Sequence, residues 1–185
     1  MQSKEKEKRI EVLIGSYKKL HNRARAELRK LENYDDVRVL APEAFWSCHK
    51  ILQEAGQKKF QNDVLSALLI FFRDRGSNSD NLKSSGQKLG KQFAGVKDVI
   101  PVKLGRFKRL MASEDMKTGF DILRKLLRLF RHEDVNWVET ANFLNSLYWY
   151  GNNPTPDNKT SLNRAKKQIA DAYFKTVLKI KKETA

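Results

Sequence analysis

The sequence predicts an all-α fold: a compact multi-helix bundle that can divide into two helical sub-bundles and has no sheet. Apolar residues recur at steps of three and four along most of the chain. No segment alternates apolar and polar residues as a pair of strands would. The 185 residues are 40% hydrophobic and 10% aromatic, which is enough to bury a core.

In the N-terminal half, helical spacing runs from Ile10 to Leu31, so residues 5–32 are predicted to form one long amphipathic helix. Pro42 suits the start of a helix and Gly56 its end, so a second helix is expected between them. Residues 60–73 are apolar on most sides and rich in Leu and Ala. They predict a central buried helix, although the run Leu68–Phe72 leaves a strand open.

In the C-terminal half, helices are expected over the segments 88–95, 102–113, 113–131, 136–151 and 161–182. Ser113 and Asp115 suit the start of the third of these helices, and Ser161 is the expected N-cap of the last. Residues 74–87 and 151–160 are rich in loop-forming residues and predict mobile loops. We expect a single all-α domain over residues 1–185, with halves of about 1–95 and 96–185.

The chain carries 37 Lys and Arg against 22 Asp and Glu, a net charge of +15 and an isoelectric point near 9.9. The excess lies in residues 1–31 (ten cations, four acids), 105–131 (eight and three) and 161–185 (seven and two). Each segment is also amphipathic, so it can bury one face and expose cations on the other. This charge favours nucleic acid first and an acidic membrane surface second, with a merely basic protein as the alternative.

The segment FDILRKLLRLFRH, residues 120–132, shows the pattern best. On a helix, apolar side chains share one face: Phe120, Leu123, Leu126, Leu127 and Phe130. Arg124, Arg128 and Arg131 follow one another on the other side. An arginine fork fits phosphate oxygens and binds the backbone without reading sequence. A solvated face is the alternative for one such stripe, but three basic segments favour binding.

No motif points to catalysis. The single cysteine, Cys48, cannot form an intramolecular disulfide, and the three histidines lie far apart in the sequence. We find no Gly-rich phosphate loop, HExxH or GxSxG motif, and we expect no cofactor. The paired carboxylates Asp35–Asp36 and Glu114–Asp115 leave a metal-dependent nuclease as an alternative, but turn and cap roles explain both pairs.

Nothing in the sequence predicts a membrane protein or a secreted one. The longest apolar run, residues 64–72, is too short to span a bilayer. The charged N-terminus lacks the apolar region of a signal peptide. We therefore expect an intracellular, cytoplasmic protein.

Five segments together resemble a known family: ARAELRKL (24–31), SSGQKLGKQF (84–93), GRFKRLMAS (105–113), LRKLLRLFR (123–131) and VNWVETANFLNSLYWYG (135–151). Their order and spacing are similar to those of the CasB family, the small subunit of the type I-E CRISPR interference complex Cascade. The resemblance covers about residues 20–151. It implies an all-helical, non-catalytic subunit, present in two copies, that holds the guide–target duplex and the displaced strand by their backbones.

The resemblance also implies partners and site residues. The partners would be other Cascade subunits, a second copy of the chain, the crRNA and the target DNA, single-stranded in the R-loop, without a membrane. The basic positions of the family fall on Arg29, Lys30, Lys91, Arg106, Arg109, Arg124, Lys125 and Arg128. We expect these to bind nucleic acid, with no catalytic or metal residue.

The alternative binding protein is a stand-alone regulator or RNA chaperone that reads nucleic acid through a helix-turn-helix. Against it, no short helix followed by a tight Gly turn and a recognition helix with polar, base-reading residues is evident.

Overall fold

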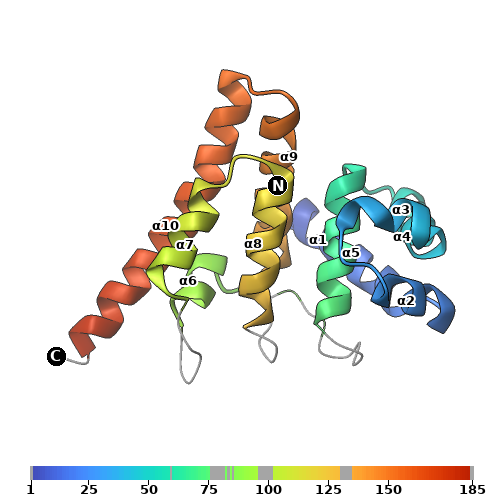
Figure 1. The fold of residues 1–185 in the computed structure, drawn as a ribbon, viewed down its shortest axis with the longest axis horizontal. Helices are drawn as coiled ribbons and strands as arrows, with labels where there is room; N and C mark the ends of the chain where they lie inside the picture. Colours follow the sequence, from blue (N-terminus) through green and yellow to red (C-terminus); the bar gives the residue numbers. More distant parts are fainter. Residues whose placement is uncertain are drawn as a thin grey trace. The chain divides into compact units, whose positions relative to one another are not determined.

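Helices form the ordered framework of the chain (Figure 1). The computed structural model describes residues 2–58, 60–75, 82, 84, 86–95, 102–129 and 135–183. Within these ranges there is no β-strand, which confirms the predicted all-α class. The chain forms two compact units, Met1–Ser84 and Ser85–Ala185. We call them the N-terminal and C-terminal units; the predicted division near residue 95 stays a prediction.

Six helical elements lie among the described residues of the N-terminal unit. They are α1 (Gln2–Lys18), α2 (Asn22–Arg29), the 3₁₀ turn η1 (Tyr34–Asp36), α3 (Val37–Leu40), α4 (Pro42–Glu54) and α5 (Asn62–Asp74). Within this unit α4 packs on α1 and α2, and α5 packs on α2 and η1.

The predicted single helix over residues 5–32 is wrong, because the chain breaks between α1 and α2. His21 leaves the helical conformation with φ −58° and ψ 151°. The guanidinium of Arg25 donates to the carbonyl of Lys18 and so satisfies one of the carbonyls left open where α1 ends. Periodicity does not detect this break because Leu20 and Ala24, on either side of it, are both buried.

Both the start and the end of α4 agree with the prediction. Pro42 occupies its first turn, and Gly56 adopts φ +65° just beyond its last residue. The N–H of Gln57 bonds the carbonyl of Leu52 at 2.9 Å, and the N–H of Gly56 bonds that of Gln53 at 3.0 Å. This pair of bonds is the Schellman motif, in which glycine tolerates the left-handed conformation.

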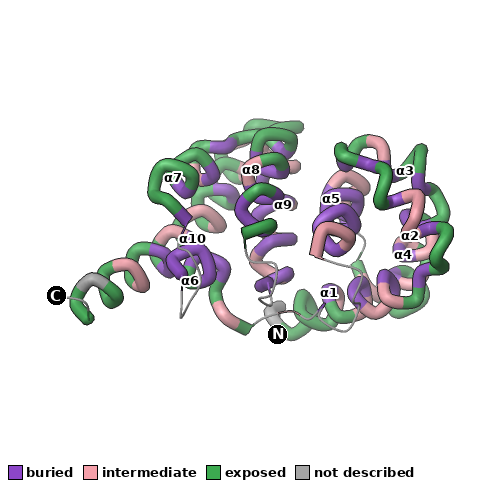
Figure 2. Tube along the Cα trace, turned by 60° about the horizontal axis from the view of Figure 1, so that its bottom comes forward, coloured by how far each residue is buried: buried purple, intermediate pink, exposed green. Residues whose placement is uncertain are grey.

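Helix α5 is the buried helix predicted for residues 60–73. Every residue from Val64 to Phe72 is buried, and Figure 2 shows most of α5 in the colour of buried residues. A helix apolar on all sides gains stability only when neighbours surround it. Because residues Asn62–Asp74 form a helix, the strand alternative is excluded. Helix α5 is the core of its unit.

The C-terminal unit contains α6 (Leu89–Ala94), α7 (Leu104–Ala112), α8 (Met116–Arg128), α9 (Trp137–Asn152) and α10 (Pro156–Glu183). Figure 1 shows α9 and α10 side by side as a hairpin. Helix α10 begins at Pro156, so the prediction of Ser161 as its N-cap is wrong. Thr155 provides an earlier start, since its hydroxyl accepts the N–H of Asn158 at 3.3 Å and proline suits a first turn.

Helices α6 and α10 approach each other closely at Gly90. A Cβ atom at this position would lie 1.8 Å from the carbonyl oxygen of Ile169 and 2.9 Å from the N atom of Tyr173. Tyr173 also holds α7, because its ring stacks on Phe107 with centroids 3.9 Å apart. Its hydroxyl donates to the carbonyl of Val102 at 2.9 Å. One region of α10 thus fixes both α6 and the start of α7.

We predict that Gly90→Ala destabilises the protein, because the new methyl group meets the rigid backbone of α10. Overpacking costs about 1–3 kcal/mol, and a backbone clash belongs at the upper end. Gly105→Ala in α7 is the matched control: nothing lies within 4 Å of its Cβ position, so it should be neutral or stabilise by up to about 1 kcal/mol. Thermal unfolding of both variants checks this, and equal melting temperatures would contradict the close contact.

Candidate nucleic-acid interface

Seven of the eight predicted binding residues are exposed. Two lie in the N-terminal unit and five in the C-terminal unit: Arg29 and Lys30, then Lys91, Arg106, Arg109, Lys125 and Arg128. The eighth, Arg124, is buried and only 7% exposed. We call the seven exposed residues the basic set.

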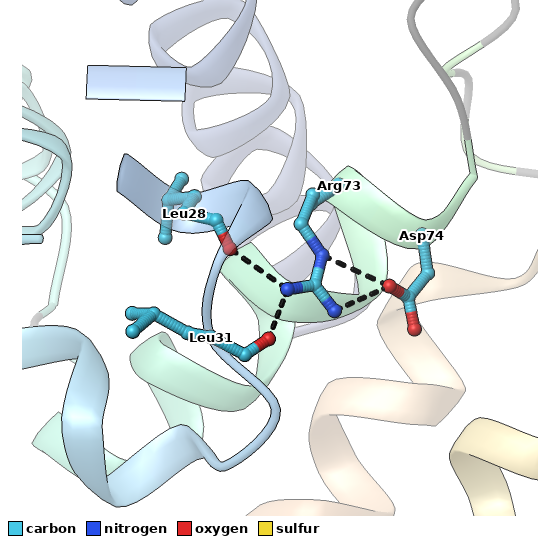
Figure 3. Close-up of polar contacts among 4 residues, drawn as sticks. All are labelled: Leu28, Leu31, Arg73 and Asp74. Atoms are coloured by element: carbon cyan, nitrogen blue, oxygen red, sulfur yellow. Dashed lines mark hydrogen bonds and ion pairs between the residues drawn. The ribbon is translucent and has the colours of Figure 1, made fainter. Parts of the chain in front are cut away.

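Arg29 and Lys30 stand at the end of α2, where a buried arginine anchors the backbone (Figure 3). Arg73 of α5 donates through Nη1 to the carbonyl of Leu28 at 2.7 Å and to the carbonyl of Leu31. Both carbonyls lie at or just beyond the end of α2, where fewer backbone N–H groups are available, and the carbonyl of Leu28 also accepts the N–H of Leu31 at 3.2 Å. A cation there also interacts favourably with the helix dipole. The chain on both sides of Arg29 and Lys30 is therefore fixed from within.

Asp74 completes this anchor. Its Oδ1 accepts from Nε of Arg73 at 2.9 Å and from Nη2 at 2.5 Å. The two side chains are only 8% and 11% exposed. A buried guanidinium needs such a partner, since an unpaired buried charge is strongly unfavourable. Sequence reasoning missed Arg73; its signal is an Arg–Asp pair that directly follows the apolar run of α5.

Lys91 is the exposed residue of α6, whose other residues are all buried. The first N–H of this helix, from Leu89, donates to the Glu139 carboxylate of α9 at 2.7 Å. In return, Gln92 accepts the N–H of Asn136 at 3.1 Å. Two helix N-termini thus satisfy each other's open N–H groups, which fixes the face on which Lys91 stands.

Helices α7 and α8 carry the remaining members of the basic set. On α7, Arg106 and Arg109 are exposed while Phe107 and Leu110 are buried. On α8, Lys125 and Arg128 lie one turn apart on the side away from the buried Leu123, Leu126 and Leu127. The two helices pack on each other. Each pair is therefore held on the outer side of a helix whose inner side is fixed in the core.

The start of α8 is capped by Asp115, as the acidic residues at 114–115 suggested. Its carboxylate accepts the N–H of Thr118 at 2.8 Å. This hydrogen bond, mainly, holds the pKa of Asp115 below its ordinary value of 3.8. The carboxylate is thus used in a helix cap.

The predicted exposure of Arg124 is wrong. Arg124 follows Phe120 by one helical turn, and its guanidinium carbon lies 5.9 Å from the centre of the Phe120 ring. This places it at the edge of the wide buried face of α8, where an arginine can cover an aromatic ring. The expected row of Arg124, Arg128 and Arg131 is therefore not a row of exposed side chains: Arg128 is exposed, and Arg131 and Phe130 lie outside the described residues.

Other candidate sites give little chemistry. Cys48 is buried, and burial raises the pKa of its thiol to about 12, so it stays protonated at neutral pH. Across the part of the chain that is described, no three His, Cys, Asp or Glu side chains gather as a metal site would require. No helix among the described residues combines the length and apolar character needed to cross a bilayer.

Residues 24–174 match the family model of the CRISPR-associated protein Cse2. The chain belongs to the Cse2 family. This confirms the resemblance to CasB, the small subunit of type I-E Cascade. The Cse2 match begins within α2 and ends within α10, so it covers part of each unit and all eight predicted binding positions. No curated protein and no solved structure matches the chain.

We predict that Arg73→Met strongly destabilises the protein, because it removes the guanidinium that pairs with the largely buried Asp74 carboxylate and that donates to the carbonyls of Leu28 and Leu31. Breaking a buried pair in this way costs about 3–5 kcal/mol. Arg23→Met is the matched control: Arg23 pairs with Glu27 at 3.4 Å but is 85% exposed, and such pairs contribute about 0–1 kcal/mol. Urea unfolding measures both, and similar losses would mean that Arg73 is no anchor.

Proposed function

We propose that this chain is a non-catalytic subunit of a type I-E Cascade complex that binds guide RNA, target DNA and the displaced strand through their phosphates. Family membership supports a place in the CRISPR system. The observation that supports the binding role is the exposure of five cations on α6, α7 and α8, helices whose inner faces are packed in the core: Lys91, Arg106, Arg109, Lys125 and Arg128.

The arrangement suits a phosphate backbone better than base edges. Arginine and lysine side chains one turn apart on a helix lie about 5–6 Å from each other, close to the spacing of phosphates along a strand. Helices α7 and α8 carry three further exposed lysines, at their starts or on their outer sides: Lys103, Lys108 and Lys117. In this proposal the cations contact phosphates, and such contacts supply affinity without sequence information.

Arg29 and Lys30 give the N-terminal unit its own phosphate contacts in this proposal. Arg73 is a positioning residue for them, since it bonds the backbone on both sides and never reaches the ligand. Arg124 is the exception among the predicted residues. A side chain 7% exposed offers a phosphate little surface, so we assign Arg124 to packing on Phe120 and rest the proposal on the basic set.

The proposed partners are other Cascade subunits, a second copy of the chain, crRNA and target DNA, in the cytoplasm and without a membrane. Nuclease chemistry has less support, because the Asp115 carboxylate caps α8. Asp36, in the other pair, accepts from the amide of Asn33 at 3.5 Å. A regulator that reads sequence would differ from our proposal in one measurable respect, a strong preference for one sequence.

We predict that Lys125→Ala with Arg128→Ala weakens binding to single-stranded DNA and RNA about tenfold or more, the equivalent of ~1.4 kcal/mol. Stability should change by no more than about 0.5 kcal/mol, since both side chains are exposed. Fluorescence anisotropy with several unrelated sequences, and thermal unfolding, measure the two effects.

The matched control for charge removal is Arg38→Ala with Lys50→Ala, two exposed cations of α3 and α4 outside the basic set. At about 0.15 M salt, where distant charges are screened, this pair should bind almost as wild type does. Equal losses of affinity in both double variants would mean that binding depends on general charge attraction and not on a defined surface. A low melting temperature with normal binding would make Lys125 and Arg128 structural.

A further inference from the structure

A cavity of about 210 Å³ in the N-terminal unit shares no lining residue with the basic set. Its lining is Glu5, Lys6, Arg9, Gln57 and Lys58. Among the described residues, the lining thus has three cations and one carboxylate. All five of these residues belong to the N-terminal unit.

The sequence brings these residues together through one helix and one turn. Glu5, Lys6 and Arg9 lie within about one turn of α1. Gln57 and Lys58 follow the Schellman turn at Gly56, which reverses the chain at the end of α4. Because α1 packs on α4, the residues after that turn face the first turns of α1.

Arg9 is the least exposed cation of the cavity and has a fixed position. Its guanidinium carbon lies 3.4 Å from the centre of the Phe60 ring, and Phe60 is 7% exposed. The Nε atom of Arg9 is buried and has no hydrogen-bond partner among the described residues. A polar atom in this situation is uncommon in folded proteins and often indicates a missing ligand or water.

Burial lowers the pKa of Arg9 from its ordinary value to about 10, and the nearby Glu5 offsets only part of that effect. Arg9 therefore keeps its charge at neutral pH while part of its hydration is lost. A cation in this state gains more from an anion than a fully solvated one, because the interaction is less screened.

The size and the donors of the cavity indicate the kind of anion. Pockets for organic cofactors and drug-sized ligands usually measure about 300–1,000 Å³, so this cavity fits a smaller group. A guanidinium, two ammonium groups and an amide offer N–H donors that suit the oxygens of a phosphate. We propose that the Arg9 cavity binds one phosphate group, supplied either as free phosphate or by the end of a nucleic-acid strand.

Calorimetric titration of the full chain with inorganic phosphate, at ionic strength held constant with NaCl, tests this site. Wild type should bind phosphate, and Arg9→Gln should bind it about tenfold more weakly or not at all. Arg23→Gln, the same change at an exposed arginine, is the matched control and should bind as wild type does. The Lys125→Ala, Arg128→Ala variant should also keep phosphate binding, which separates this site from the proposed nucleic-acid surface.

Arg9→Gln also removes the stack of Arg9 on Phe60, so a second variant is needed to separate phosphate binding from folding. Lys6→Gln leaves that stack intact and should still weaken phosphate binding several-fold. Two single-stranded oligonucleotides of one sequence, with and without a 5′-phosphate, identify the source. Tighter binding of the phosphorylated strand that is lost in Lys6→Gln and Arg9→Gln assigns the site to a strand end. Equal binding of both strands, with phosphate still bound, assigns it to free phosphate. No phosphate binding in wild type, or equal binding in wild type and both cavity variants, would overturn the proposal.

Discussion

The close approach of α6 to α10 at Gly90 is the constraint on which the C-terminal unit depends. Without a side chain at this position, α6 can lie against the backbone of α10 near Ile169, and all its residues except Lys91 become buried. Tyr173, next to the same contact, holds α7 through Phe107. Helix α8 then packs on α7 and α9. The outward direction of the cations on α6, α7 and α8 follows from this order of packing.

In the N-terminal unit, a different interaction fixes the backbone that carries the exposed cations. Arg73 and Asp74 form a buried pair that holds the end of α2 by its carbonyl groups. Arg73 is largely buried, and its hydrogen bonds fix the backbone on both sides of the exposed residues Arg29 and Lys30. Arg73 and Arg124 show that an arginine in a basic protein can serve the fold, because its planar group can bond carbonyls or cover an aromatic ring.

Local signals in the sequence predicted a large part of this fold. Apolar character on all sides predicted α5, and Pro42 and Gly56 predicted the limits of α4. The break between α1 and α2 could not be predicted from periodicity, because buried residues continue across it and the stabilising donor, Arg25, is recognised only in three dimensions. The early start of α10 depends on Thr155 and Pro156, inside a stretch whose composition resembles a loop.

The sequence proposes residues for the candidate site, but it does not determine how their side chains pack. A helical projection places Arg124 beside Phe120, but only packing decides that the side chain turns to the ring and away from solvent. Arg73 was missed because its role depends on carbonyl groups at residues far away in the sequence. The Arg9 cavity likewise combines residues of α1 with a turn more than forty positions later, so no linear pattern marks it.

The central claim is that exposed cations of this chain bind nucleic acid by neutralising phosphates. The most direct measurement is the affinity of the purified chain for a single-stranded oligonucleotide as a function of salt between about 50 and 200 mM. Our account predicts a linear fall of log K with log salt, with a slope of about −0.7 for each phosphate contacted, and the same slope for unrelated sequences. An affinity that does not change with salt, or that depends strongly on one sequence, would contradict it.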